Sequence, residues 1–339
     1  MTSPARPDET AVRQALAKAV GDRLASMRLG AESLTVVLEV GGLDTLGRDK
    51  LEIAVRGALH GLGDLPPLRI AQMAERGETV APKKPRIIAV GSGKGGVGKS
   101  TVSANIAVAL ARMGVKVGLV DADIYGPSQP RLMASEGERP TAKDKTLNPV
   151  PTRYGVPMLS MGHLAEPGQA IAWRGPMAGN ALAQLIEADW GDVDTLVVDL
   201  PPGTGDVQLT MIQRFKPAGA VIVSTPQDLA LMDATRAIGL FDKAGVPVIG
   251  MVENMAGYAC PHCGEVSDPF GQGGAEAAAK TMGYDFLGRI PLTLNIRAAS
   301  DAGQPPAAGD DDAGAPFVAI AGKVADWLKA NADAEPVTA

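Results

Sequence analysis

The sequence contains few cysteines, only 2 among its 339 residues. Both lie in the segment GYACPHCGEV, as Cys260 and Cys263, with two residues between them. A structural zinc ion needs four ligands, and an iron–sulfur cluster is normally held by four thiolates. Two thiols therefore cannot complete either kind of site within one chain. If this pair holds a metal or a cluster, a second copy of the chain must supply the other two ligands.

The chain also lacks an excess of basic residues, a long apolar run and an apolar leader. Lys and Arg number 32 against 38 Asp and Glu, a net charge of −6, which argues against nucleic acid as a partner. No apolar run approaches the roughly 18 residues that a membrane span requires, and the first residues have no signal-peptide pattern. We therefore expect a cytoplasmic protein with no nucleic-acid or membrane partner. Thiols stay reduced in that compartment, so a structural disulfide is not expected.

The patterning divides the chain into a small first domain and a larger second one. Helical and strand patterns in residues 1–75 predict a small α+β domain, with helices over 8–25 and 44–62 and strands over 34–40 and 66–74. Residues 76–86 are charged, contain proline and lack periodicity, which is typical of a linker. We expect the second domain over 87–332 and a disordered tail over 333–339.

The second domain has the pattern of an α/β fold. Aromatic residues are only 4% of the chain, so its core must be mostly aliphatic. Short, nearly continuous apolar segments, which are typical of strands buried on both faces, alternate with helical stretches. This alternation predicts a mostly parallel sheet with helices on both faces. The predicted strands are 86–92, 116–123, 194–201, 219–226, 246–254 and 285–291, and the principal predicted helices are 99–113, 228–244 and 316–331.

A phosphate-binding loop follows the first of these strands. The segment GSGKGGVGKST matches G-x-x-x-x-G-K-[ST] and leads into a predicted helix, as a P-loop requires. Its glycines let successive backbone N–H groups converge on phosphate oxygens, and the helix N-terminus adds partial positive charge. Lys99 is expected to reach the β- and γ-phosphates of ATP, and Ser100 to bind Mg²⁺. The predicted ATP-binding residues of the loop are Gly93, Lys94, Gly95, Gly96, Val97, Gly98, Lys99, Ser100 and Thr101.

Three aspartates follow strands of the predicted sheet. Asp121 and Asp123 end the segment VDAD, and alternation along a strand would point both side chains the same way. Asp199 ends the apolar segment LVVD, in a Walker B arrangement. Ligands of open α/β sheets bind at this carboxyl edge, and Mg²⁺ prefers oxygen ligands. We assign Asp123 to positioning the attacking water, and Asp121 and Asp199, with Ser100, to the Mg²⁺ site.

Several segments together carry a resemblance to a known family. GSGKGGVGKST, VDADIYGPSQPRLM, VVDLPPGTGD and VENMAGYACPHCG occur in the order found in the Mrp/ApbC family of iron–sulfur cluster carrier ATPases. The similarity spans about residues 86–330, and the first domain resembles the small assembly-type domain that often precedes such ATPases. Lys94 marks the loop as similar to the deviant Walker A of the MinD/ParA and nitrogenase-iron-protein ATPases.

The resemblance implies roles for particular residues. Lys94 would reach across a homodimer to the partner's nucleotide and neutralise charge on the γ-phosphoryl group, as an arginine finger does. Asn254 would hydrogen-bond the adenine edge. Cys260 and Cys263 would bind a [4Fe–4S] cluster that bridges the two subunits. The implied function is an ATP-hydrolysing carrier that transfers a labile cluster to apo iron–sulfur proteins.

Other interpretations of the cysteine pair stay open. A buried structural pair is disfavoured because the surrounding segment is polar and rich in glycine. A redox disulfide of the thioredoxin type would place the thiols at a helix N-terminus, which the following GEVSDPFGQGG does not favour. A shared zinc ion satisfies the same ligand count as a cluster. The alternative function is thus a MinD/ParA-like positioning ATPase whose cysteines hold a structural zinc; an ATP-dependent reductase is a third possibility, disfavoured by the C-x-x-C spacing.

Overall fold

The computed structural model describes residues 8–332, except 42, 44, 74–83, 125, 145 and 165–175. The chain separates into two compact units, Met1–Lys83 and Lys84–Ala339. The linker predicted over 76–86 lies outside the described residues as far as residue 83, and Arg86 already belongs to a strand. The tail predicted over 333–339 lies outside them entirely.

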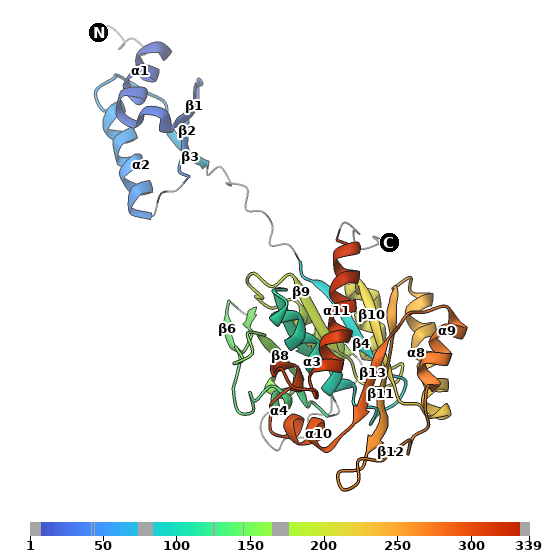
Figure 1. Ribbon diagram of the computed structural model, residues 1–339. Helices are drawn as coiled ribbons and strands as arrows, with labels where there is room; N and C mark the ends of the chain where they lie inside the picture. The colour runs from blue at the N-terminus through green and yellow to red at the C-terminus, as the bar shows by residue number, and fades with distance from the viewer. Residues whose placement is uncertain are drawn as a thin grey trace, which may run out of the picture. The chain divides into compact units, whose positions relative to one another are not determined.

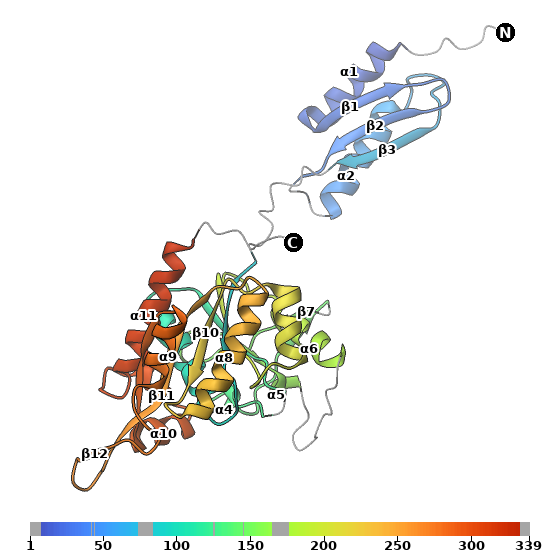
Figure 2. The same ribbon diagram turned by 90° about the vertical axis from the view of Figure 1, so that its right-hand side faces the viewer.

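The first unit is a three-stranded sheet covered by two helices (Figure 2). Its elements are α1 (Glu9–Val20), β1 (Leu24–Leu29), β2 (Leu34–Glu39), α2 (Thr45–Leu59) and β3 (Leu68–Met73), with a short 3₁₀ turn at Gly21–Arg23. β2 lies in the centre, antiparallel to β1 and parallel to β3. Leu34, Val36 and Leu38 alternate along β2 and are fully buried, so one face of the sheet packs on the helices.

One prediction for this unit was wrong. The helix predicted over 8–25 ends at Val20, and the residues after Arg23 form β1. Gly21 follows the helix with φ +55° and ψ −137°, a backbone conformation that glycine adopts easily and other residues avoid, so the α-helix ends there. β1 has one buried apolar position, Met27, so its sequence carries little strand signal.

The second unit is built on an eight-stranded sheet (Figure 1). The order is β12-β11-β10-β4-β9-β5-β8, with β13 also paired to β11, and all neighbours are parallel except β12. The strands are β4 (Arg86–Gly91), β5 (Val117–Asp121), β8 (Met158–Ser160), β9 (Thr195–Asp199), β10 (Gly219–Ser224), β11 (Val248–Ala259), β12 (Val266–Ser267) and β13 (Phe286–Leu292). β6 (Thr141–Lys143) and β7 (Thr146–Asn148) form a separate hairpin.

Helices cover both faces of this sheet, which confirms the predicted fold class (Figures 1 and 2). α3 (Lys99–Arg112) and α11 (Ala315–Ala330) pack on one face, and α6 (Pro176–Ile186), α8 (Asp228–Lys243) and α9 (Gly274–Met282) pack on the other. The remaining helical segments are α4 (Gln129–Leu132), α5 (Met161–Leu164), α7 (Asp206–Thr210) with a π turn at Met211–Phe215, α10 (Leu294–Asp301) and a 3₁₀ turn at Pro306–Ala308. In the part of the chain that the structure describes, no helix is both long and apolar enough to cross a membrane.

The strand predicted over 246–254 is longer than expected. β11 continues to Ala259, where Tyr258 pairs with Ser267 and Ala259 with Val266 of β12. The segment that carries the cysteines is therefore a β-hairpin, which projects from the sheet in both views (Figures 1 and 2). Its polar residues gave no strand pattern, because both faces of a projecting hairpin are solvated.

Candidate functional site

The P-loop connects β4 to the N-terminus of α3 and lines a cavity of about 300 Å³. Gly96 and Gly98 adopt φ +80° and +77°, where other residues would be strained. A Cβ at Gly93 would lie 2.0 Å from the carbonyl carbon of Asp233, so only glycine fits there. The loop residues from Lys94 to Thr101 line the cavity together with Asp123. The other lining residues are Ser92, Ser128, Arg131, Leu132, Pro202, Ser300 and Asp301.

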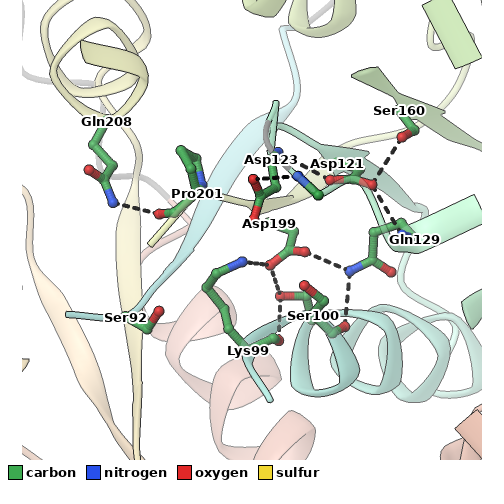
Figure 3. A network of polar contacts seen from close by, with 12 residues as sticks. Ser92, Lys99, Ser100, Asp121, Asp123, Gln129, Ser160, Asp199, Pro201 and Gln208 are labelled. Atoms are coloured by element: carbon green, nitrogen blue, oxygen red, sulfur yellow. Dashed lines mark hydrogen bonds and ion pairs between the residues drawn. The ribbon is translucent and has the colours of Figure 1, made fainter. Parts of the chain in front are cut away.

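A buried ion pair lies beneath the P-loop. Lys99 Nζ donates a hydrogen bond of 2.5 Å to Asp199 Oδ1, and the side chains are 6% and 0% exposed (Figure 3). Ser103 Oγ donates to the same carboxylate oxygen at 2.9 Å. Gln129 Nε2 donates to the other oxygen, Oδ2, at 2.9 Å. Both oxygens of Asp199 thus accept hydrogen bonds from side chains of the chain itself, and Lys99 neutralises its charge.

Asp121 lies beside this pair and is fully buried. Its Oδ2 accepts hydrogen bonds from Gln129 N at 3.1 Å and from Ser160 Oγ at 2.9 Å (Figure 3). Burial, followed by repulsion from the Asp199 carboxylate, raises the pKa of Asp121 from 3.8 to about 7. Burial and the neighbouring carboxylate therefore oppose full ionisation of Asp121.

The predicted metal residues fit a magnesium ion by their chemistry. Ser100 offers a hydroxyl, and Asp121 and Asp199 offer carboxylates, which are the hard oxygen donors that Mg²⁺ prefers. A divalent cation at this site would relieve the repulsion that raises the pKa of Asp121.

Asp123 does not follow the strand alternation that we expected, because β5 ends at Asp121. Its backbone N–H donates to Asp121 Oδ1 at 3.1 Å, and its Oδ1 accepts from Gly126 N at 3.3 Å. Asp123 instead lies in the loop after the strand, where it lines the cavity while Asp121 and Asp199 do not. Of the three aspartates, it is therefore the one that a water in this cavity can meet.

Three residues of this network were not predicted: Ser103, Gln129 and Ser160. Gln129 is fully buried, and its Nε2 also donates to the Ser100 carbonyl at 2.9 Å. Its sequence neighbours, in GPSQP, gave no sign of this role, because its partners are 29 and 70 residues away. Ser103 could have been found by its place one helical turn after Lys99.

The structure places two predicted nucleotide contacts at the rim of the loop. Lys94 is half-buried, and its Nζ donates to Gln227 Oε1 of the same chain at 3.1 Å. Asn254 Nδ2 donates to the Val97 carbonyl at 2.8 Å. A Cβ at Gly98 would lie 2.2 Å from Asn254 Nδ2, so the glycine permits this approach. The predicted contact of Asn254 with adenine would have to use its other amide atom or a rearranged side chain.

The two cysteines lie at the tip of the β11–β12 hairpin, Cys260 half-buried and Cys263 exposed. The turn is closed by Cys260 N to the Glu265 carbonyl at 2.9 Å and by Gly264 N to the Cys260 carbonyl at 2.8 Å. The Cys260 sulfur accepts a hydrogen bond from the backbone N–H of His262, which has the largest effect, and others from the backbone N–H and the thiol of Cys263. These hydrogen bonds lower the pKa of the Cys260 thiol. No helix begins at this tip, so the arrangement lacks the helix N-terminus of a thioredoxin-type redox site.

The first strand of the mostly parallel sheet leads through GSGKGGVGKST into a helix, and the neighbouring strand ends in a Walker B aspartate. These features define a P-loop nucleoside triphosphatase. The fold and the loop together place the chain in this class. A family model, ParA, described as NUBPL iron-transfer P-loop NTPase, matches residues 83–325. The chain belongs to this family.

Known proteins with similar sequences support the assignment. An iron–sulfur cluster carrier protein of Pseudomonas fragi is 49% identical over 226 residues, 66% of this chain and 79% of that protein. An Arabidopsis thaliana protein named iron–sulfur protein required for NADH dehydrogenase, mitochondrial, is 52% identical over 221 residues, 65% of this chain and 70% of that protein. A nucleotide-binding protein from Archaeoglobus fulgidus, solved in complex with ADP, has a TM-score of 0.60 at 40% identity and covers 69% of this chain and 91% of that one.

Proposed function

We propose that this chain is an ATP-hydrolysing carrier that holds a labile [4Fe–4S] cluster between two copies of itself and transfers it to apo iron–sulfur proteins. The observation that carries the proposal is the solvent-accessible cysteine pair at the tip of a hairpin that belongs to the same sheet as the P-loop. The similarity to proteins named as iron–sulfur cluster carriers supports it.

The ligand count requires the homodimer. Each chain has 2 cysteines, and a cluster with four thiolate ligands takes both from each of two chains. The exposed position of Cys263 gives a recipient thiolate access to the cluster. Transfer is then a series of ligand exchanges, in which recipient thiolates replace those of Cys260 and Cys263 and no electron is gained or lost.

The nucleotide half of the cycle uses the P-loop. Lys99 and the loop N–H groups bind the phosphates of ATP, and Mg²⁺ would be held by Ser100 at the cavity wall, with the buried carboxylates of Asp121 and Asp199 behind it. Asp123 orients the attacking water. Lys94 leaves Gln227 of its own chain and reaches the partner's nucleotide, where it stabilises the transition state. The half-buried rim position of Lys94 is compatible with this change of partner.

The unit Met1–Lys83 has its own core and acts as an assembly-type module. We place the protein in the cytoplasm and propose neither nucleic acid nor membrane as a partner. The net charge of −6 supports this choice.

Anaerobic reconstitution with iron and sulfide tests the proposal. The wild-type protein should bind about four iron and four sulfide per dimer, develop the broad visible absorbance of a cluster and pass it to an apo-protein. Cys260→Ala and Cys263→Ala should each abolish loading and transfer while retaining ATP hydrolysis. His262→Ala is the matched control, since it alters the same turn without removing a thiol, and it should load normally.

The competing zinc interpretation gives a different result. Purified protein that holds about one zinc per dimer, stays colourless with iron and sulfide and transfers nothing would favour the positioning ATPase with a structural metal. A cysteine variant that still loads and delivers iron would also refute the carrier assignment.

A further inference from the structure

One strand, β11, links the P-loop to the cysteine hairpin. β11 runs without a break from Val248 to Ala259, so Asn254, which contacts the P-loop, and Cys260, at the hairpin tip, are six residues apart on the same segment. At about 3.3 Å per residue, they are separated by at most about 20 Å of extended chain. Any movement of the chain at Asn254 therefore has a short covalent path to the cysteine hairpin.

Hydrogen bonds hold β11 in place next to the P-loop, at Glu253 and Asn254. Asn254 donates to the Val97 carbonyl at 2.8 Å, directly before the glycine that opens α3. Glu253 is fully buried and accepts hydrogen bonds from Gly273 N at 3.3 Å, Ala275 N at 2.8 Å and Arg289 Nε at 2.9 Å. Since the chain returns from the hairpin through residues 268–273, Glu253 anchors the outgoing and returning segments at one point.

Between Asn254 and the hairpin, β11 contains a strained bulge. The pairing with β13 goes from Asn254 with Ile290 to Tyr258 with Leu292, so β11 gains two residues relative to its neighbour. Gly257 has φ +73° and Met255 has φ +61°. The left-handed region is costly for methionine, which has neither the freedom of glycine nor the local hydrogen bonding of asparagine. Strained residues persist where the surrounding structure holds them, and bulges often redirect a strand beside a functional site.

We propose that Met255–Gly257 is a hinge that transmits nucleotide occupancy of the P-loop to the Cys260–Cys263 hairpin. Asn254 is the residue that hydrogen-bonds the P-loop, and Met255, whose Cε would lie 3.6 Å from a Cβ at Gly98, is the positioning residue whose strained backbone sets the direction of the hairpin. Nucleotide binding changes the backbone at Val97 and Gly98, Asn254 follows, and Met255 relaxes out of the left-handed region. Only the cargo of the hairpin rests on the proposed function, since the hinge itself needs no cluster.

Hydrogen–deuterium exchange on the full-length, cluster-free protein tests the hinge. In the wild type, saturating Mg·ADP should change the exchange rates of the amides in 256–267. Met255→Gly and Met255→Asn, which both tolerate a positive φ, remove the bias that drives the hinge. In these variants the nucleotide-dependent change should shrink by about fivefold or more, the factor that corresponds to the lower end of the cost of a left-handed residue. Met255→Ala removes the side chain but keeps the strain, so it should respond as the wild type does.

The outcomes separate this inference from the carrier assignment. The hinge proposal would be overturned if ADP did not change amide exchange in the wild-type hairpin. It would also be overturned if Met255→Gly and Met255→Asn both kept the full ADP-dependent change. Loss of the response in Met255→Ala as well would assign the effect to the side chain and also overturn it. Calorimetric titration with ADP in each variant shows that the site is filled. If the protein fails to bind iron, the carrier assignment fails but these exchange results still stand. If the protein binds a cluster but exchange in the hairpin does not change with ADP, only the hinge proposal fails.

Discussion

Replacing Asp199 by asparagine should make the nucleotide-free protein less stable and its affinity for ADP higher. Asp199 and Lys99 are 0% and 6% exposed and 2.5 Å apart. Breaking a buried ion pair by removing one partner costs about 3–5 kcal/mol, because the other charge stays buried without compensation. At the lower limit of this range, the melting temperature of the second unit should fall by about 6 °C or more.

The same change should favour nucleotide binding in the absence of Mg²⁺. In the wild type, Lys99 must leave Asp199 before it can reach the phosphates, so the ion pair opposes binding. In Asp199→Asn, the phosphates supply the negative charge that Lys99 lacks. If only about 1.4 kcal/mol of the pair's stabilisation is recovered, the affinity for ADP rises about tenfold. Hydrolysis with Mg²⁺ should fall, because Asp199 is one of the proposed metal residues.

Calorimetric titration with ADP in excess chelator and thermal unfolding with and without ADP measure both effects. Ser103→Ala is the matched control, because it removes a 2.9 Å hydrogen bond to the same oxygen of Asp199 without changing the charge. It should leave the affinity for ADP nearly unchanged. If Asp199→Asn binds Mg²⁺-free ADP no more tightly than the wild type, Lys99 is not held back by the ion pair and the reasoning fails.

Three further predictions follow from single contacts. Lys94→Ala should lower kcat for ATP by about 10³-fold or more, as loss of an arginine finger does, whereas Gln227→Ala, which removes only the 3.1 Å resting contact of Lys94, should keep its activity. Gly93→Ala should reduce the free energy of unfolding by about 1–3 kcal/mol and weaken ATP binding, because its Cβ would lie 2.0 Å from a backbone carbon of Asp233. Burial lowers the pKa of His163 from 6.5 to about 4, so between these pH values the unfolded chain binds more protons than the folded one. The free energy of unfolding, measured by denaturant titration, should therefore fall by on the order of 1 kcal/mol per pH unit as the pH drops below about 6.5.

Each of these has a discriminating control. Gly95→Ala introduces a Cβ that meets only the Pro202 side chain at 3.7 Å, so it should cost much less than Gly93→Ala. His163→Gln should flatten the acid dependence of stability, and an unchanged slope would assign that dependence to other groups. Equal losses of activity in Lys94→Ala and Gln227→Ala would show that the resting contact, and not a contact across the dimer, is what hydrolysis needs.

The parts that the sequence could predict are those encoded locally. β4, β9 and β10 are short apolar runs because both faces of the sheet are covered, and the P-loop motif fixes the strand before it and the helix after it. β1 and the cysteine hairpin escaped prediction because few of their side chains are buried. Gln129 escaped for another reason: its partners are distant in sequence, and the pairing exists only once β5, β9 and α3 are assembled.

The proposed connection between the nucleotide site and the cysteine pair could not be predicted from local sequence either. The loop after β9 is rich in glycine and proline and is a second candidate for responding to the nucleotide, because Gly203 N donates to the Ser92 carbonyl beside the P-loop at 3.0 Å. The contact that continues toward the cysteines, however, is that of Asn254 on β11. We expect the two segments to respond to different parts of the nucleotide, since Asn254 contacts Val97 inside the P-loop, whereas Gly203 of the loop after β9 contacts Ser92 before it. ADP should therefore be sufficient to alter the hairpin, and a non-hydrolysable ATP analogue should add a change at residues 201–205; if the hairpin responds to the analogue alone, the signal travels through the loop and not along β11.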